Sequence, residues 1–243
     1  MITTSEIKYV KSLSQKKFRD SSGLFVVEGE KMVEEALRSG FSLYRLYREE
    51  EIGKAAMARM TGLSSPSPAL AVLHQRPLPS KLEIPARGLF LALDGIRDPG
   101  NLGTILRIAD WFGADAVYCS PDTVELYNPK VVQASMGAIF RVKVFQADLP
   151  SFCREVRASG GYVYGTFLDG ENLYSRPIET GNGAASVIVT GNESRGISKE
   201  VAACVSDRLY IPPYPADDPG SESLNAAIAT AVTLAEFRRR SVL

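Results

Sequence analysis

Apolar residues along this chain recur in two spacings, and these spacings predict where strands and helices lie. From Arg87 onward, short apolar runs alternate with stretches in which apolar residues recur every three or four positions, as in strands joined by crossover helices. The predicted strands are Leu89–Leu93, Ala116–Cys119, Val142–Phe145, Tyr162–Thr166, Ser186–Thr190 and Arg208–Ile211. The predicted helices lie near 101–112, 128–138, 149–158, 198–204 and 223–239. This pattern predicts an α/β domain built on a parallel sheet.

The N-terminal part of the chain shows a smaller α/β pattern. Its predicted elements are helices at Ser5–Lys17, Lys31–Arg38 and Ile52–Met60 and strands at Leu24–Val27 and Leu43–Tyr47. Between Thr61 and Ile84, prolines and serines interrupt regular structure and are typical of a linker, with room for one short strand at Ala69–Leu73. We therefore expect a small domain at residues 1–75, a linker at 76–86 and a larger domain at 87–243.

The composition is that of a globular protein, and it narrows the possible chemistry. Of the 243 residues, 45% are hydrophobic and 23% are charged, with 28 lysines and arginines balancing 28 aspartates and glutamates. No apolar stretch is long enough to span a bilayer, and the N-terminus lacks the apolar core of a signal peptide. We expect a cytoplasmic protein that does not bind a membrane. His74 is the only histidine, and the three cysteines lack the spacing of a zinc site, so no metal is expected.

The stretch Leu91–Gly113 carries the most specific functional signal. A buried strand is followed by a break containing Asp98, and then by a helix that Asn101 can cap. Arg107 lies off the apolar stripe of this helix. We expect it to point toward the space beyond the carboxyl end of the strand, where open α/β sheets bind their ligands.

Two further stretches follow predicted strands. In Val189–Gly196, Gly191 and Gly196 allow the backbone to approach a ligand closely, and Glu193 lies between them. Taken alone, a surface turn with a solvated glutamate is the commoner explanation. In Ile211–Asn225, Ser223 and Asn225 stand at a helix start, where they could cap the helix or contact a ligand. The helix that follows has an apolar stripe that suits either a core or a dimer contact, made by Leu224, Ile228, Ala231, Val232 and Ala235.

The first twenty residues are locally basic, although the whole chain has no net charge. Five basic residues there outnumber Glu6 and Asp20, and they are Lys8, Lys11, Lys16, Lys17 and Arg19. A second basic group, Arg238–Arg240, closes the last helix. Both groups are compatible with a solvated face and with contacts to an acidic partner such as nucleic acid.

Together, the three stretches resemble the SpoU-type RNA ribose 2′-O-methyltransferases of the trefoil-knotted SPOUT superfamily. The first family motif is similar to Asp98–Arg107, the second to Val189–Ser198, and the third to Ile211-Pro212 with Glu222–Asn225. The resemblance covers residues 87–240. Residues 5–37 are similar to the N-terminal substrate-binding domain of many members, which has an L30e-like fold.

The resemblance implies a C-terminal methyltransferase domain whose chain is threaded into a knot, which ordinary folds avoid. It also implies a homodimer, in which one subunit completes the other's site, and S-adenosylmethionine as methyl donor. The residues that match the family's cofactor contacts are Thr166, Gly191, Ile211 and Leu224. The residues that match its catalytic motifs are Asn101, Arg107, Glu193, Ser223 and Asn225.

The role of Arg107 stays open at this point. The matching arginine in the family has been assigned to activate the ribose hydroxyl, yet a guanidinium resists deprotonation. Stabilisation of the developing alkoxide and two-point binding of a phosphate are the alternatives. The implied substrate is structured RNA, foremost ribosomal RNA and otherwise transfer RNA, because RNA readers usually recognise loops and bulges. Lys8, Lys11, Lys16, Lys17 and Arg19 are the expected phosphate contacts.

The chain departs from the family pattern in one loop. Pro213–Pro219 inserts prolines and aspartates before the third motif, next to the expected cofactor site.

Two other functions are compatible with parts of the sequence. A non-catalytic protein that binds structured RNA or assists ribosome assembly is the main alternative, but such a protein has no chemical need for the complete set of motif residues. A serine hydrolase using Ser221 or Ser223 is disfavoured, because the chain lacks a nucleophile elbow and has only His74 as a base.

Overall fold

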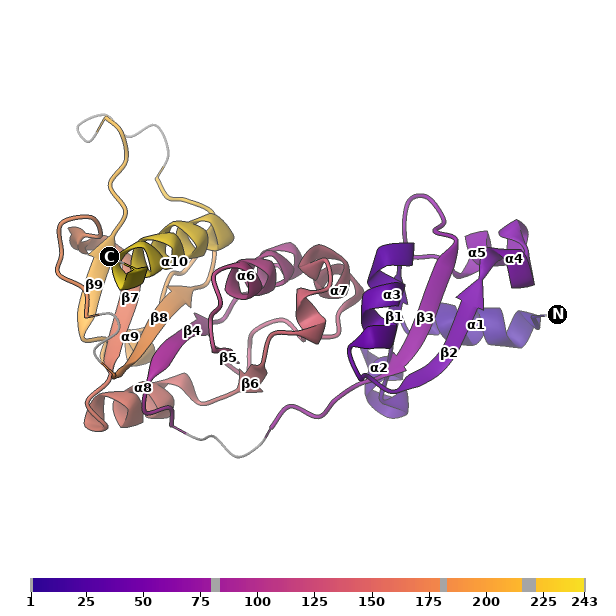
Figure 1. Cartoon of the computed structure of the whole chain (residues 1–243), viewed down its shortest axis with the longest axis horizontal. Coiled ribbons are helices and arrows are strands. Elements are labelled where there is room, and N and C mark those ends of the chain that lie inside the picture. Colours follow the sequence, from indigo (N-terminus) through magenta and orange to yellow (C-terminus); the bar gives the residue numbers. More distant parts are fainter. Residues whose placement is uncertain (1, 80–83, 180–182, 216–221, 243) are drawn as a thin grey trace. The chain divides into compact units, whose positions relative to one another are not determined.

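The computed structural model describes residues 2–79, 84–179, 183–215 and 222–242, and the chain divides into two compact units (Figure 1). The first unit consists of Met1–Pro77 with Glu125–Arg141, and the second of Leu78–Val124 with Val142–Leu243. Asp217 and Asp218 of the proline-rich insertion lie outside the described residues. Among the helices of the described ranges, none is both long and apolar enough to cross a membrane.

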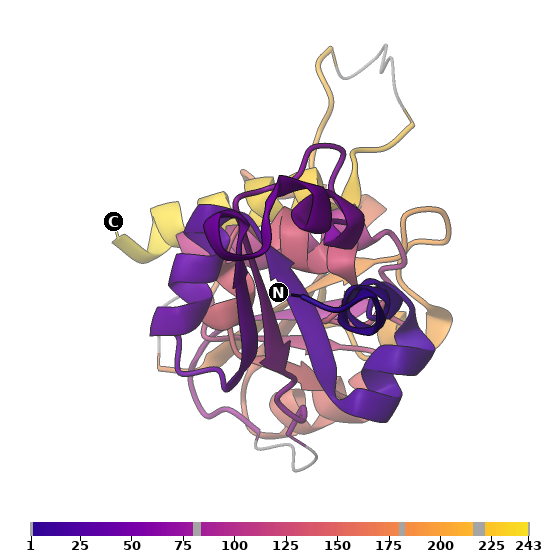
Figure 2. The same cartoon turned by 90° about the vertical axis from the view of Figure 1, so that its right-hand side faces the viewer.

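The first unit is built on a three-stranded antiparallel sheet with helices on both faces (Figure 2). Its strands, in spatial order, are β1 (Leu24–Glu28), β3 (Ala69–His74) and β2 (Leu43–Arg48). One face packs against α1 (Thr4–Ser12) and α5 (Lys54–Met60), and the other against α3 (Glu30–Arg38) and α7 (Pro129–Ser135). The remaining short helices are α2 (Lys16–Ser22), α4 (Glu49–Ile52) and a 3-10 turn at Ala138–Phe140.

The strand β3 is more important than its sequence context suggests. The predicted strand at Ala69–Leu73 exists, but it is the central strand of the sheet and not a minor element of a linker. All five of these residues are buried, because alternate side chains enter the cores on the two faces. The prolines around it therefore mark the ends of a strand.

The segment Glu125–Arg141 packs with the first unit, although it lies within the range 87–243 expected for the second domain. The ring of Tyr127 lies 4.6 Å from the ring of Phe25, measured between centroids. The Tyr127 hydroxyl both accepts a hydrogen bond from the Arg76 N–H and donates one to the Arg76 carbonyl, each at 3.0 Å. Arg141 forms an ion pair with Glu35 of α3. The local pattern of apolar residues carries no information about such distant partners.

The second unit contains a six-stranded parallel sheet, as the sequence predicts. The strands, in spatial order, are β6 (Val144–Gln146), β5 (Ala116–Cys119), β4 (Gly88–Asp94), β8 (Ala185–Gly191), β7 (Tyr162–Asn172) and β9 (Asp207–Tyr210). Every pair of neighbouring strands is parallel. The α/β class and the parallel sheet are confirmed, and the knot implied by the resemblance stays a prediction.

Helices cover both faces of this sheet (Figure 1). On one face, α8 (Leu149–Ala158) and α9 (Lys199–Ala202) pack on alternate residues of β4 and β8. On the other, α6 (Pro99–Trp111) packs against α10 (Ala226–Val242), which also contacts β8. The buried residues of α10 include Ala226, Ala227, Thr230, Leu234 and Phe237.

The apolar stripe expected on the last helix is not its buried face. Leu224 and Ile228 are 49% and 50% exposed, and the other three members of the stripe are only half-buried. The core reading of this stripe is therefore wrong. The helix buries a different set of small and apolar residues, which leaves the stripe at the surface.

Candidate active site

The candidate site lies at the carboxyl edge of the six-stranded sheet, between the loops that follow β4 and β8. These strands are neighbours, and their last residues, Asp94 and Gly191, are aligned in register. The chain continues from β4 into α6 on one face of the sheet, and from β8 into α9 on the opposite face. Open α/β sheets bind ligands where adjacent connections diverge in this way.

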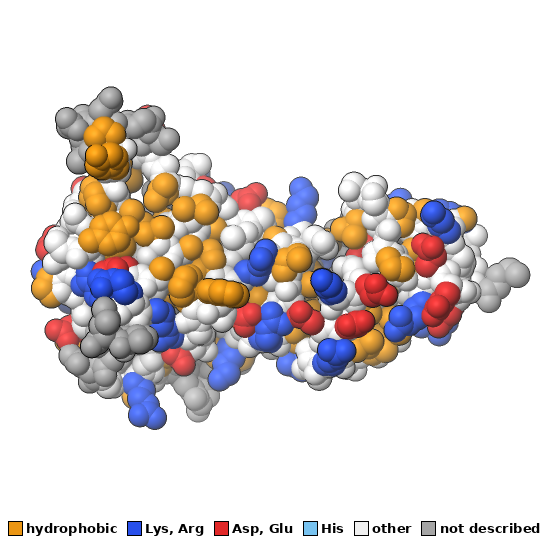
Figure 3. All heavy atoms as spheres, turned by 45° about the horizontal axis from the view of Figure 1, so that its top comes forward, with side chains coloured by type: hydrophobic (Ala, Val, Ile, Leu, Met, Phe, Trp, Pro, Cys, Tyr) orange, Lys and Arg blue, Asp and Glu red, His pale blue; other side chains and the backbone are white. Residues whose placement is uncertain are grey.

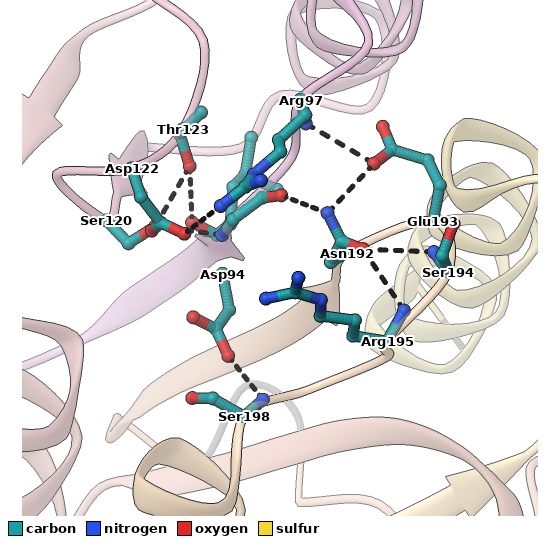
Figure 4. Close-up of polar contacts among 12 residues, drawn as sticks. Asp94, Arg97, Ser120, Asp122, Thr123, Asn192, Glu193, Ser194, Arg195 and Ser198 are labelled. Atoms are coloured by element: carbon teal, nitrogen blue, oxygen red, sulfur yellow. Dashed lines mark hydrogen bonds and ion pairs between the residues drawn. The ribbon is translucent and has the colours of Figure 1, made fainter.

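Glu193 accepts four hydrogen bonds at this edge, of which Figure 4 shows those from Arg97 and Asn192. Its carboxylate accepts hydrogen bonds from the backbone N–H groups of Arg97 and Asp98, at 3.3 and 3.1 Å. It also accepts one from Asn101 Nδ2 at 2.9 Å and one from Asn192 Nδ2 at 3.3 Å. Three of these donors belong to the first turn of α6 or to the loop just before it, where a helix favours negative charge.

These contacts determine the protonation state of Glu193. Partial burial raises the pKa of its carboxyl, but the hydrogen bonds from Asn101 and from the backbone of Asp98 and Arg97 outweigh burial and lower the pKa below its ordinary value. The side chain is therefore a carboxylate at neutral pH. It can accept hydrogen bonds and hold its neighbours in place, but it carries no proton to donate.

Asn101 and Asn225 connect Glu193 to the start of α10. Asn225 Nδ2 donates to Asn101 Oδ1 at 2.8 Å. The Asn225 Oδ1 atom accepts from the backbone N–H groups of Ala227 and Ile228, at 2.9 and 3.3 Å, and so caps α10. The amide of Asn101 thus donates to Glu193 and accepts from Asn225. One residue from each of the three sequence motifs takes part in this continuous chain of hydrogen bonds.

The structure does not bring the other two expected catalytic residues into this network. Arg107 lies on α6 with its side chain exposed, and it makes no hydrogen bond or ion pair with another residue of the described ranges. Ser223 is likewise exposed and unbonded within the part of the chain that the structure describes. The guanidinium of Arg107 is consequently accessible to a substrate.

Gly191 is required by the tight turn that carries Glu193. The chain folds back after β8 so that Asn192 and Gly196 exchange two backbone hydrogen bonds, each 2.9 Å long. A Cβ atom on Gly191 would lie 2.2 Å from the backbone carbon of Gly196 and from the nitrogen of Ile197. Only glycine fits at this position, so its presence follows from space and not from conformational freedom.

Asn192 is a positioning residue that the sequence analysis did not single out. Its Nδ2 atom donates to the Gly95 carbonyl at 2.7 Å, and its Oδ1 atom accepts from the N–H groups of Ser194 and Arg195, at 3.0 and 3.1 Å (Figure 4). It therefore connects the loop after β8 to the loop after β4. Its position between Gly191 and Glu193 was the available signal, but an Asn that follows a glycine is equally typical of an ordinary turn.

The loop after β5 supports the same site from the other side of β4. Ser120 Oγ accepts from the Gly95 N–H at 2.8 Å and donates to Asp122 at 2.7 Å. Asp122 also lies 3.6 Å from the guanidinium of Arg97, and Asp94 accepts from the Ser198 N–H at 2.7 Å (Figure 4). These contacts fix the loop from which α6 begins. No pattern in the sequence identified them, because their partners are far apart along the chain.

The residues expected to contact the cofactor lie along one edge of three adjacent strands. Gly191 ends β8, Thr166 lies in β7 and Ile211 follows β9, and all three are half-buried. Thr166 Oγ1 donates to the Val189 carbonyl at 3.2 Å, which holds its side chain against β8. Leu224 adds an exposed apolar side chain before α10. This combination of apolar side chains with a glycine backbone fits a ligand that contains an adenine ring.

Arg19 differs from the other expected phosphate contacts. Its side chain is 2% exposed, and its guanidinium donates to the Leu13 carbonyl at 2.7 Å and forms an ion pair with Glu125. This placement removes Arg19 from the candidate RNA contacts, because its charge is already paired inside the first unit. The four lysines of the set are exposed, although Lys16 Nζ lies 2.5 Å from Asp20.

The arginines at the end of α10 also have structural partners. Arg238 Nε donates to the Phe112 carbonyl at 2.6 Å, at the end of α6. Arg240 donates to the Leu173 carbonyl at 2.7 Å and, with Arg239, holds the buried carboxylate of Glu236. The hydrogen bond from Arg239 is the main reason that the pKa of Glu236 falls to about 2. These arginines stabilise the packing of the second unit, which accounts for their charge without contacts to a nucleic acid.

Comparisons with known proteins agree with this arrangement. The model of the SpoU rRNA methylase family matches residues 88–235, and that of the MRM3-like substrate binding domain matches residues 4–73. The chain belongs to the SpoU rRNA methylase family. It is 31% identical to the 23S rRNA (guanosine(2553)-2′-O)-methyltransferase RlmP of Bacillus subtilis, over 96% of each chain.

Two solved structures extend the comparison to the fold. A protein from Porphyromonas gingivalis, assigned to the TrmH family of RNA methyltransferases, superposes with a TM-score of 0.84 at 39% identity, over 99% of this chain and 100% of that one. An rRNA methyltransferase from Sinorhizobium meliloti with bound AdoMet superposes with a TM-score of 0.82 at 30% identity, over 99% and 96% of the two chains.

Proposed function

We propose that this chain transfers the methyl group of S-adenosylmethionine to the 2′-hydroxyl of a ribose in ribosomal RNA. Membership of the SpoU rRNA methylase family, the similarity to RlmP and the AdoMet bound to the Sinorhizobium meliloti relative support this reaction. The observation that carries it in this molecule is the chain of hydrogen bonds from Glu193 through Asn101 to Asn225. It joins all three motifs into one fixed site at the edge where such sheets bind ligands.

Arg107 and the hydrogen-bonded residues Glu193, Asn101 and Asn225 have different roles in this reaction. S-adenosylmethionine supplies a methyl group on a positively charged sulfur, and the ribose oxygen must lose its proton as it takes that methyl. Arg107 stays protonated in a protein, so we assign it to the developing negative charge on the ribose oxygen or to an adjacent phosphate. Glu193, Asn101 and Asn225 hold the loops in position, and Ser223 is free to orient the substrate.

Thr166, Gly191, Ile211 and Leu224 are the residues that we assign to the cofactor. The first three lie along β7, β8 and the end of β9, where backbone groups and short side chains can surround an adenine. The glycine is needed in any case for the turn that carries Glu193. Binding of the cofactor and placement of the catalytic loop are thereby coupled through a single residue.

Ribosomal RNA is a better-supported substrate than transfer RNA. The relatives named above include an enzyme that acts on 23S rRNA, and residues 4–73 match a substrate-binding domain. Within that domain, Lys8, Lys11, Lys16 and Lys17 offer exposed positive charge for phosphates. Arg19 is not among these contacts, because its guanidinium is buried and paired with Glu125.

A homodimer is the assembly that the surface of the second unit favours. Apolar side chains gather on the face that carries α6 and α10 (Figure 3). Trp111 is 84% exposed there, and Leu224 and Ile228 are about half exposed, which is unusual for large apolar residues unless a partner covers them. Sedimentation of the Ile228→Glu variant should give a monomer where the unaltered chain gives a dimer. A dimer that persists in this variant would exclude this face as the contact.

The decisive experiment is transfer of labelled methyl from S-adenosylmethionine to unmodified ribosomal and transfer RNA, followed by nucleoside analysis. We expect label in a 2′-O-methylnucleoside of the ribosomal pool, with none when Arg107 is replaced by alanine. Label in the transfer RNA alone would keep the reaction and change the substrate. RNA binding without cofactor binding or transfer would favour the alternative function, a non-catalytic protein that binds structured RNA.

A further inference from the structure

An exposed cluster of three aromatic rings lies on the first unit, on the face of the sheet that carries α1. The rings of Tyr9 and Tyr44 are 6.5 Å apart between centroids, and those of Tyr44 and His74 are 5.9 Å apart in an edge-to-face arrangement. Tyr9 is 40% exposed and Tyr44 52% exposed, and His74 is also exposed. Rings that keep this much exposed surface gain only part of the stabilisation that full burial would give, so stability is a weak reason for grouping them.

A β-bulge brings Tyr44 into this cluster. In the pairing of β2 with β3, Leu43 is opposite Leu73 and Arg45 is opposite Val72, which leaves Tyr44 as the extra residue. Successive side chains of a regular strand point to opposite faces. The successive residues Tyr44 and Arg45 nevertheless both contact α1. The Tyr44 ring packs near Tyr9, and the Arg45 guanidinium lies 3.7 Å from Glu6. The irregularity turns an aromatic ring toward α1 that regular pairing would direct to the other face.

Positive charge lies next to two of the rings in the sequence. Lys8 precedes Tyr9 and Arg45 follows Tyr44, and both cations are exposed. Arg76 is not part of this group, because its guanidinium lies over the Phe41 ring, 4.0 Å from the centroid. Interleaved rings and cations are typical of surfaces that bind single-stranded nucleic acid, where bases stack on the rings and the cations contact the phosphates. A surface for an apolar protein partner has no comparable need for cations next to its rings.

We propose that Tyr9, Tyr44 and His74 form a stacking surface for unpaired bases of the RNA substrate, with Lys8 and Arg45 binding the adjacent phosphates. The inference rests on the proposed function for the identity of the RNA, and Tyr9 and Tyr44 lie within the segment that matches a substrate-binding domain. It adds a chemical class of ligand, an unstacked loop or bulge, which a duplex cannot supply because its bases are already stacked.

The test measures binding of the full chain to a fluorescein-labelled single-stranded RNA of ten nucleotides and to the same RNA annealed to its complement. Tyr44→Ala should weaken binding of the single strand at least about fivefold, the scale for stacking one base, and leave duplex binding unchanged. Tyr44→Phe should bind as the unaltered chain does, and Tyr44→Leu should behave like Tyr44→Ala. Tyr174→Ala, which removes an equally exposed tyrosine (52%) of the second unit, should change nothing.

Several outcomes would overturn the inference. Unchanged affinity for the single strand in both Tyr44→Ala and Tyr9→Ala would do so, and so would an equal loss of duplex binding. Full rescue by Tyr44→Leu would indicate an apolar contact with a protein in place of stacking. Because this assay needs neither cofactor nor methyl transfer, it can succeed when the proposed reaction fails. Equally, methyl transfer whose KM for RNA is unchanged by Tyr44→Ala would support the reaction and reject the stacking surface.

Discussion

The carboxyl edge of the six-stranded sheet and the α1 face of the first unit display their functional groups in opposite ways. At the sheet edge, Glu193, Asn101 and Asn225 are bonded to one another and to the backbone of the loops that carry them. On the α1 face, Tyr9 and Tyr44 offer exposed rings beside exposed cations. A catalytic site gains from groups that need no rearrangement during the reaction, whereas a binding surface can adapt to RNA of varied shape.

Arg107 and Arg19 differ in the same way, although both are arginines. Arg107, the expected catalytic residue, is exposed and forms no hydrogen bond or ion pair within the described part of the chain. Arg19, the expected RNA contact, is buried and held by Leu13 and Glu125. A guanidinium with unused donors can bind a substrate, while one whose donors are already taken stabilises the fold. The environment, and not the residue type, decides between these roles.

The strongest test of this contrast is Arg107→Ala. We expect methyl transfer to fall by about 10²-fold or more, the scale for removing one preorganised electrostatic group, because the developing negative charge would lose the guanidinium that stabilises it. Affinity for S-adenosylmethionine, measured by calorimetry, should be retained. Arg107→Lys keeps the charge but loses the planar pair of donors, so partial activity in that variant would identify charge as the main contribution.

The control for this variant is Arg154→Ala, which removes an exposed arginine from α8 on the opposite face of the sheet. It should transfer methyl at the unaltered rate. If Arg107→Ala also transfers at that rate in single-turnover measurements, Arg107 has no part in the mechanism.

A second test concerns Arg19 and measures stability in place of methyl transfer. Arg19→Ala leaves the Glu125 carboxylate and the Leu13 carbonyl without their partner, and we expect the free energy of unfolding of the first unit to fall by about 3 kcal/mol. Lys16→Ala, which removes an exposed lysine of the same helix whose partner Asp20 is also exposed, should cost less than about 0.5 kcal/mol. Urea denaturation of both variants checks this order. A stable Arg19→Ala protein that has lost RNA affinity would return Arg19 to the RNA contacts.

The burial of Arg19 shows why part of the structure was beyond reach from the sequence. Its partner Glu125 lies 106 residues further along the chain, and no local spacing of apolar or charged residues reports such a contact. The six strands of the second unit could be predicted because each is a short apolar run between turn residues. The central position of β3 could not be predicted in this way. The prolines beside it resemble those of a linker, and the strands that pair with it are distant in the sequence.

The candidate site was partly predictable on the same grounds. Glu193, Asn101 and Asn225 stand directly after strands or at helix starts, where side chains of separate loops converge. Asn192 and Ser120 were missed, because their roles arise from hydrogen bonds to the backbone of Gly95. Such contacts depend on how loops meet, and the sequence states only which loops exist.

A third test breaks the network at Glu193 without leaving a cavity. Glu193→Gln keeps the shape but removes the charge that four donors face, and we expect transfer to fall roughly tenfold, in line with about 1.4 kcal/mol for one charged hydrogen-bond acceptor. Glu155→Gln, on the exposed face of α8, is the matched control and should leave transfer unchanged. Normal transfer by Glu193→Gln would show that the network needs only the shape of the side chain.

The same variant has a characteristic dependence on pH. The folded-state pKa of Glu193 is lowered, so its charge contributes stability above its unfolded pKa of about 4.3 and loses that contribution as pH falls through the folded value. The unaltered protein should therefore be more stable than Glu193→Gln at pH 7, and the difference should shrink below about pH 4. Unfolding in urea at pH 7 and in acid measures it. A difference that does not depend on pH would contradict a charged Glu193.

The smallest expected effects concern the four exposed lysines of the first unit. Each of Lys8→Ala, Lys11→Ala and Lys17→Ala should weaken RNA binding by about two- to threefold and reduce the slope of log affinity against log salt concentration by about 0.7 to 0.9. Lys16→Ala should do less, because Asp20 already neutralises part of its charge at 2.5 Å. Lys143→Ala, an exposed lysine of the second unit, is the control. Since these contacts depend on charge and not on fixed geometry, the corresponding arginine variants should keep the full slope. A slope that stays constant in all four alanine variants would remove the lysines from the RNA surface and leave the aromatic rings as its main element.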